Sequence, residues 1–193
     1  GFKKMKKINF LISGFLLICL GCSKVEIVKL PITTSSQEAL EYYTEAEKLL
    51  GLNIGEGPEI RALLDSAIKL DPNFAMALEM YPTSDQLLAR EYEEKAKQLS
   101  SKITEAERKT LSIRESYRSG NMDAALEGAV WLVENHENSY ESYLMLGLVQ
   151  SDRRELDEAI SSLNKALELN PDSYKANYLL MGHHIGLGGQ SML

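Results

Sequence analysis

The chain has 193 residues, of which 44% are hydrophobic and 25% are charged, and its formal net charge at pH 7 is −7. This length and composition suffice to bury the core of one folded domain, which excludes a wholly disordered chain. The first 21 residues hold four lysines and no acid, so the rest of the chain carries 17 basic and 28 acidic residues. That balance argues against nucleic acid as a partner, because phosphate binding needs clustered Lys and Arg.

An apolar run of thirteen residues, 8–20, follows two lysines near the N-terminus. The run is too short to span a bilayer comfortably, but it has the length of the hydrophobic region of an export signal. It contains Cys19 and is followed by Cys22, the two cysteines of the chain, so no disulfide framework is expected. The C-x-x-C spacing also occurs in redox and metal sites, but such sites need a folded surround, and this pair stands at the end of an export run.

Residues 1–21 together with Cys22 resemble a bacterial lipoprotein signal peptide. The resemblance implies cleavage directly before Cys22 and a diacylglycerol group on the Cys22 sulfur. Cys19 and Leu20 depart from the usual pattern, which has Leu and then a small residue, so plain secretion and an uncleaved anchor remain open. Ser23 stands where proteobacterial lipoproteins retained in the inner membrane have Asp. This implies a lipid anchor in the outer membrane, facing the periplasm.

Beyond the signal, residues 22–36 are rich in Ser and Thr and contain Pro31, which predicts a flexible tether. Apolar residues then recur at spacings of three and four, which predicts helices separated by glycines, prolines and caps. The predicted helices are 36–50, 58–70, 74–81, 84–100, 104–119, 122–134, two within 140–171, and 174–185. We expect the folded region to cover 37–187, with the glycines after Ile185 ending the last helix and a disordered tail at 188–193.

The stretch 140–173 contains the clearest helix pair. Gly147 and Ala159 remove side chain where two helices would cross, so the backbones can approach closely, and Pro171 ends the second helix. Such a pair cannot bury its apolar face alone and calls for neighbours of its own kind. The unit closely resembles a tetratricopeptide repeat, whose usual large, small and proline positions are occupied by Tyr143, Leu146, Gly147, Ala159, Leu163, Ala166 and Pro171.

The resemblance implies an all-α fold, a right-handed α-solenoid of about four and a half such repeats. Counting back 34 residues places Gly120 on the usual turn and Ala125 on the small crossing position of a third, degenerate repeat. The helix that begins at Tyr174 would open a fifth repeat with no second helix after it. Because this last helix stays apolar, either the chain is truncated or a second copy covers the helix, as a homo-oligomer formed through the C-terminal helix.

In repeats of this family the concave face comes from five positions of each first helix. The groove residues implied for this chain are Glu107, Thr110, Leu111, Arg114, Tyr117, Glu141, Leu144, Met145, Leu148 and Tyr178, with Ser151, Lys175 and Leu179 at further such positions. The groove lacks the Lys and Asn set with which chaperone-binding relatives hold a terminal carboxylate. It suits an amphipathic helix or an extended segment of a protein or peptide partner. The alternative that Leu144 and Leu148 only pack between repeats stays open.

No catalytic residue, metal site or cofactor is predicted. His183 and His184 are adjacent on a helix and point about 100° apart, so they cannot share one metal as an i, i+4 pair would. The glycines at 186–189 follow a helix instead of opening one, unlike a phosphate-binding loop. The sequence therefore predicts a non-enzymatic scaffold, tethered to a membrane, in a bacterial envelope assembly. The alternative is a fragment of a larger sensor or regulatory protein built from the same repeats.

Overall fold

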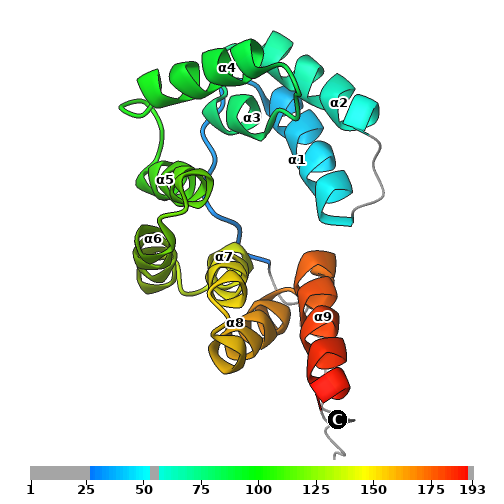
Figure 1. The fold of residues 1–193 in the computed structure, drawn as a ribbon. Helices are drawn as coiled ribbons and strands as arrows, with labels where there is room; N and C mark the ends of the chain where they lie inside the picture. The colour runs from blue at the N-terminus through cyan, green and yellow to red at the C-terminus, as the bar shows by residue number, and fades with distance from the viewer. Residues whose placement is uncertain (1–26, 53–56, 191–193) are drawn as a thin grey trace, which may run out of the picture.

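The computed structural model describes residues 27–52 and 57–190, and of residues 51–52 and 184–190 it describes the backbone. The expected signal peptide, Cys19 and Cys22 lie outside these residues. Within them the fold is all-α (Figure 1). The helices are α1 (Gln37–Leu52), α2 (Gly57–Leu70), α3 (Ala75–Met80), α4 (Gln86–Gln98), α5 (Glu105–Ser119), α6 (Met122–Asn135), α7 (Tyr140–Asp152), α8 (Leu156–Leu169) and α9 (Tyr174–Gln190).

Consecutive helices form the pairs α1–α2, α3–α4, α5–α6 and α7–α8, and α9 packs on α8 as the first helix of a fifth repeat. Figure 1 shows the first helix of each pair on the inner side of an arch and the second helices on the outside. The expected solenoid of about four and a half tetratricopeptide-type repeats is confirmed. α1 also contacts α9, so the first and fifth repeats meet and the arch closes on itself.

The close helix crossings follow from small residues. A Cβ atom added to Gly147 on α7 would lie 2.7 Å from Cγ of Leu163 on α8, which is closer than real side chains approach. Gly147 is therefore required at the crossing that the sequence predicts, and Ala159 beside it is fully buried. In the third repeat the roles are exchanged, because Gly128 on α6 faces the buried Ile113 on α5 at an equally short distance.

Helix ends follow the expected caps. Thr104 and Glu107 form a capping box at the start of α5, and Gly120 ends that helix in the left-handed conformation with φ 73°. Arg154, 34 residues later, takes φ 64° at the corresponding turn. The last helix is a correction, because α9 continues to Gln190 through the glycines after Ile185 and extends beyond residue 187. Glycine weakens a helix, by about 1 kcal/mol each relative to Ala, but does not forbid it.

The N-terminal residues that the structure describes are not free of the repeats. Residues 27–35, which we call the strap, are extended and run past the starts of α7 and α5 toward α1, in blue in Figure 1. Val28 forms a parallel bridge with Ser139. Further along the strap, Leu30 packs against the core of α5, α6 and α7, and Ile32 against that of α1, α2 and α3. This part of the expected flexible tether is thus a docked segment.

Candidate functional site

A cavity of about 900 Å³ lies inside the arch, enclosed by α1, α3, α5, α7, the start of α9 and the strap. Its size falls within the range of ordinary ligand-binding sites. Eight of the ten groove residues predicted from the repeat positions line it. These eight are Glu107, Thr110, Arg114, Tyr117, Glu141, Leu144, Met145 and Leu148.

Two predicted groove residues lie elsewhere. Leu111 packs against the cores of the first two repeats and lines a smaller hollow between α4 and α5. Tyr178 is half exposed on α9, where its ring stacks on that of Tyr174 with 6.3 Å between centroids. The fifth repeat contributes Lys175 and Tyr174 to the cavity in its place. Ser151 and Leu179, at further groove positions, do not line the cavity.

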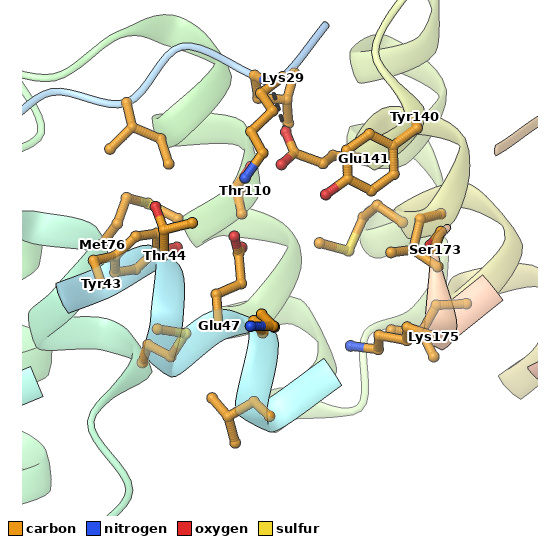
Figure 2. A pocket seen from close by; sticks show the side chains of 18 of the residues that line it. Lys29, Tyr43, Thr44, Glu47, Met76, Thr110, Tyr140, Glu141, Ser173 and Lys175 are labelled. Atoms are coloured by element: carbon orange, nitrogen blue, oxygen red, sulfur yellow. Dashed lines mark hydrogen bonds between the residues drawn. The ribbon is translucent and has the colours of Figure 1, made fainter. Parts of the chain in front are cut away.

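The cavity also has walls that the repeat positions did not indicate. α1 supplies Tyr43 and Glu47, and α3 supplies Met76 and Glu79. The strap closes one side with apolar side chains, among them Ile32. Figure 2 shows side chains from α1, α3, α5, α7, α9 and the strap converging on one space. The site therefore draws on the whole arch and not only on the third to fifth repeats.

Carboxylates at the starts of the first helices hold the strap by its backbone. Oε2 of Glu141 accepts the N–H of Leu30 at 2.6 Å, the bond drawn in Figure 2. Oε1 of Glu107 accepts the N–H of Thr33 at 2.8 Å, and Oε2 accepts the Thr33 hydroxyl at 2.6 Å. At the end of α2, Asp71 accepts the N–H of Ser35 and the hydroxyl of Thr34, both at 2.7 Å. Hydrogen bonds to charged acceptors are stronger than neutral ones, so the strap is anchored at three points.

Two of these carboxylates occupy the same repeat position. Glu107 is the second residue of the third repeat, and Glu141 stands 34 residues later as the second residue of the fourth. Glu107 has a further role, because its Oε2 also accepts the backbone N–H of Thr104 at 2.8 Å within the capping box. The start of α5 therefore keeps its cap whether or not the strap is bound.

Glu141 carries an unfavourable charge. Burial and then the neighbouring Glu47 carboxylate raise the pKa of Glu141 to about 7, against the opposing effects of the Leu30 N–H, Lys29 and the Tyr140 hydroxyl. Figure 2 shows Glu47 and Glu141 on opposite sides of the same space, with Lys29 and Lys175 also pointing toward it. No ion pair joins any two of these four side chains.

The arginine in the cavity wall is already paired. Arg114 forms an ion pair with Glu79 of α3, whose side chain is 6% exposed, and Arg118 reaches the other Glu79 oxygen at 3.0 Å. A second carboxylate, Glu93 on α4, lies 3.2 Å from Arg118. This network fastens α5 to α3 and α4. It also leaves Arg114 partly neutralised, so the wall is largely apolar with few free charges.

One pair of residues resembles a nucleophile with its base. Oγ of Ser151 lies 2.8 Å from Nε2 of His183, but it also lies 2.6 Å from the carbonyl oxygen of Gly147. A carbonyl only accepts, so the serine hydroxyl donates to Gly147 and Nε2 of His183 donates to the serine. A histidine in that state cannot remove the serine proton. The arrangement therefore does not favour nucleophilic catalysis.

Two further searches cover the described part of the chain. No three or more His, Cys, Asp or Glu side chains are grouped there as metal ligands would be. Among the same residues, no helix combines the length and the apolar character needed to cross a bilayer.

Neither the protein-family models nor the curated proteins contain a match to the chain. Among solved structures it is similar to YrrB, described as a TPR protein with an unusual peptide-binding site, at 22% identity over 78% of each chain with a TM-score of 0.43. It is also similar to MamA of AMB-1, at 19% identity over 78% of this chain and 82% of that one, with a TM-score of 0.41. A MamA double mutant of RS-1 aligns at 15% identity over 82% of this chain and 99% of that one, with a TM-score of 0.37.

Proposed function

We propose that this chain is a protein-binding scaffold that holds a segment of a partner protein in the cavity inside the arch. The observation that carries the proposal is the cavity itself, about 900 Å³ in volume and lined by the first helices of all five repeats. Side chains such as Tyr117, Leu144 and Leu148 give it a wall that an apolar or aromatic anchor of a partner can cover. Binding of this kind requires no chemical step.

The proposal places the scaffold on a bacterial membrane, anchored through Cys22 in the outer membrane and facing the periplasm. Its support is the sequence alone: an apolar run, 8–20, preceded by lysines and followed by Cys22 and Ser23. A lipid-anchored scaffold would act in an envelope assembly, where it holds partner proteins near the membrane.

The proposal also includes self-association through α9. Tyr174, Tyr178 and Met181 are 43%, 51% and 53% exposed and lie at spacings of four and three on one face of the helix. In a complete repeat, a second helix would pack beside α9. A second copy of the chain offers a surface of the same kind.

Partner capture tests the cavity. A photo-reactive residue in place of Met145, in the cavity wall, should cross-link a partner in envelope preparations. Replacing Tyr117 and Leu148 by Ala should reduce this cross-linking at least tenfold while leaving the helical content unchanged by circular dichroism. The control replaces the exposed, outward-facing Leu87 and Val130 by Ala. Cross-linking that is equally strong in both double variants would move the binding face elsewhere.

Membrane anchoring has a separate test. The chain expressed from Met5 in a bacterium should yield a product cleaved before Cys22 that carries diacylglycerol, seen by intact mass, and should fractionate with membranes. Cys22→Ala should abolish both the added mass and the lipid-dependent fractionation, whereas Cys19→Ala should leave both intact. An unmodified, soluble product in a host whose lipoprotein enzymes process a control signal would contradict the anchor.

A further inference from the structure

The spacing of the strap's hydrogen bonds matches the spacing of the repeats. Leu30 and Thr33, three residues apart, donate their N–H groups to Glu141 and Glu107, which occupy the same position in consecutive repeats. Three residues of extended chain span about 10 Å. Neighbouring packed helices lie about 8–10 Å apart. An extended peptide laid across the first helices thus presents one N–H to the second-position carboxylate of each repeat it crosses.

The strap is also a weakly held segment. Ile27 and Val28 at its outer end are 43% and 47% exposed. Leu30 and Ile32 are only partly buried, and the strap's contact with the helix starts includes a single isolated bridge and no sheet. Segments with few buried apolar contacts open at low free-energy cost. The cores beneath it, in contrast, are formed by fully buried residues of the helices themselves.

Neither carboxylate depends on the strap for the integrity of the fold. Glu107 continues to cap α5 through Thr104 when Thr33 leaves. Glu141 keeps an unfavourably buried charge even with the Leu30 N–H bound, as its raised pKa indicates. A bound peptide of the same backbone form would satisfy both side chains equally well.

We propose that the strap is an intramolecular competitor at the partner site, and that the partner is an extended peptide whose N–H groups, three residues apart, donate to Glu141 and Glu107 in place of Leu30 and Thr33. This inference rests on the proposed function and names the partner's form and the contact that regulates its access. The strap closes one side of the cavity, so its release both frees the two carboxylates and opens the apolar wall behind them.

The test uses the full chain and a labelled peptide, IVKLPITTSS, which has the sequence of residues 27–36. In the parent protein the strap competes at the high effective concentration of a tethered segment. Replacing Leu30 and Thr33 together by Pro removes both N–H donors and keeps an extended backbone. Fluorescence anisotropy should then show the peptide binding at least about tenfold more tightly than to the parent, because each charge-assisted hydrogen bond contributes a factor of roughly ten or more.

Matched controls separate the backbone bonds from other effects. The double Val variant at Leu30 and Thr33 keeps both N–H groups and should bind the peptide no more than a few-fold more tightly than the parent. A peptide N-methylated at the Leu30 and Thr33 positions should lose binding to the Pro variant, whereas one N-methylated at the Ile32 position, whose N–H has no hydrogen bond to the described residues, should keep it. Adding Glu141→Ala to the Pro variant should weaken binding at least about tenfold.

The parent chain gives an independent measurement that does not depend on any variant folding. Excess peptide should speed hydrogen exchange of the Leu30 and Thr33 amides, and the peptide methylated at those two positions should not. Equal affinity of the two methylated peptides, or unchanged exchange of the strap, would overturn the inference. The cross-linking of a partner at Met145 could still be observed in that case, so the proposed function would stand without this mode of binding.

Discussion

Glu141 combines a structural contact with an electrostatic cost. The titratable and charged groups that face it are Glu47 from α1, Lys29 from the strap and Tyr140 from its own helix. Its pKa of about 7 in the folded chain stands above its ordinary value of 4.5. Between these two pH values the folded state binds more protons than the unfolded state, so the free energy of unfolding falls as the pH rises from about 4.5 to 7.

Glu141→Gln tests this sign. The amide oxygen can still accept the Leu30 N–H, but no charge is buried. We expect the variant to be more stable than the parent by about 1–3 kcal/mol at pH 8, since one unit of pKa difference corresponds to about 1.4 kcal/mol. Urea unfolding at pH 8, 6 and 4.5 should show the advantage shrinking as the pH falls. The exposed Glu134→Gln is the control, and an advantage independent of pH would exclude the charge of Glu141 as its cause.

At the scale of helices, the two clearest repeats solve the same crossing in opposite ways. In the fourth repeat the first helix carries the glycine, and Leu163 of the second helix fills the space above Gly147. In the third repeat the first helix carries Ile113, and the second helix provides Gly128. Either arrangement removes one side chain where two backbones approach. The loss of the family's small residue at position 113 is therefore compensated by its partner helix.

Adding a methyl group at two helical glycines should have opposite effects. Gly147→Ala places a Cβ 2.7 Å from Cγ of the fully buried Leu163, whereas nothing lies within 4 Å of a Cβ at Gly182. We expect Gly147→Ala to lower the free energy of unfolding by about 1–2 kcal/mol through overpacking. Gly182→Ala should raise it by roughly 0.5–1 kcal/mol through helix propensity. Thermal unfolding measures both, and a neutral Gly147→Ala would contradict the close crossing.

The sequence was most informative where the 34-residue register is intact. The capping box at Thr104, the turn at Gly120 and the crossing at Gly147 were all predictable, because each is fixed by residues close in sequence. The groove positions of the third and fourth repeats follow from the same register. Leu111 is the exception there, since the short α3 brings the second repeat close enough to cover it.

The remaining walls of the cavity were not predictable from local pattern. The glycine-rich insertion after α1 and the six-residue α3 interrupt the register, so positions such as Glu47 and Met76 could not be assigned. The strap has the Ser, Thr and Pro content of a linker, and its partners lie 111 residues away at Glu141 and 74 residues away at Glu107. Only the folded arch brings these carboxylates to the strap.

On the scale of the whole molecule, closure of the arch gives the cavity its opposite wall. α1 and α9 contact each other although they stand at the two ends of the folded region. A long open solenoid would present a groove, whereas this short one presents an enclosed space. The outer face of α9 is left uncovered by the same arrangement.

Self-association through that face can be measured by sedimentation velocity. Replacing Tyr178 and Met181 by Lys should shift the chain from dimer to monomer, because two lysines would be brought against the same apolar face of the second copy. Asn177→Lys, at an exposed position on the same helix, should leave the sedimentation coefficient unchanged. Identical sedimentation of the parent and the double variant would assign the uncovered face to another role.

The docked strap sets how far the folded domain stands from a membrane. In a chain lipidated at Cys22, only residues 23–26 separate the anchor from the strap, a leash of at most about 18 Å. The domain would then sit against the headgroups with the start of α7 nearest to them. Release of the strap adds nine residues and about 30 Å of reach. Capture of a peptide in the strap's place would thus also lift the domain away from the lipid surface, coupling occupancy of the cavity to height above the membrane.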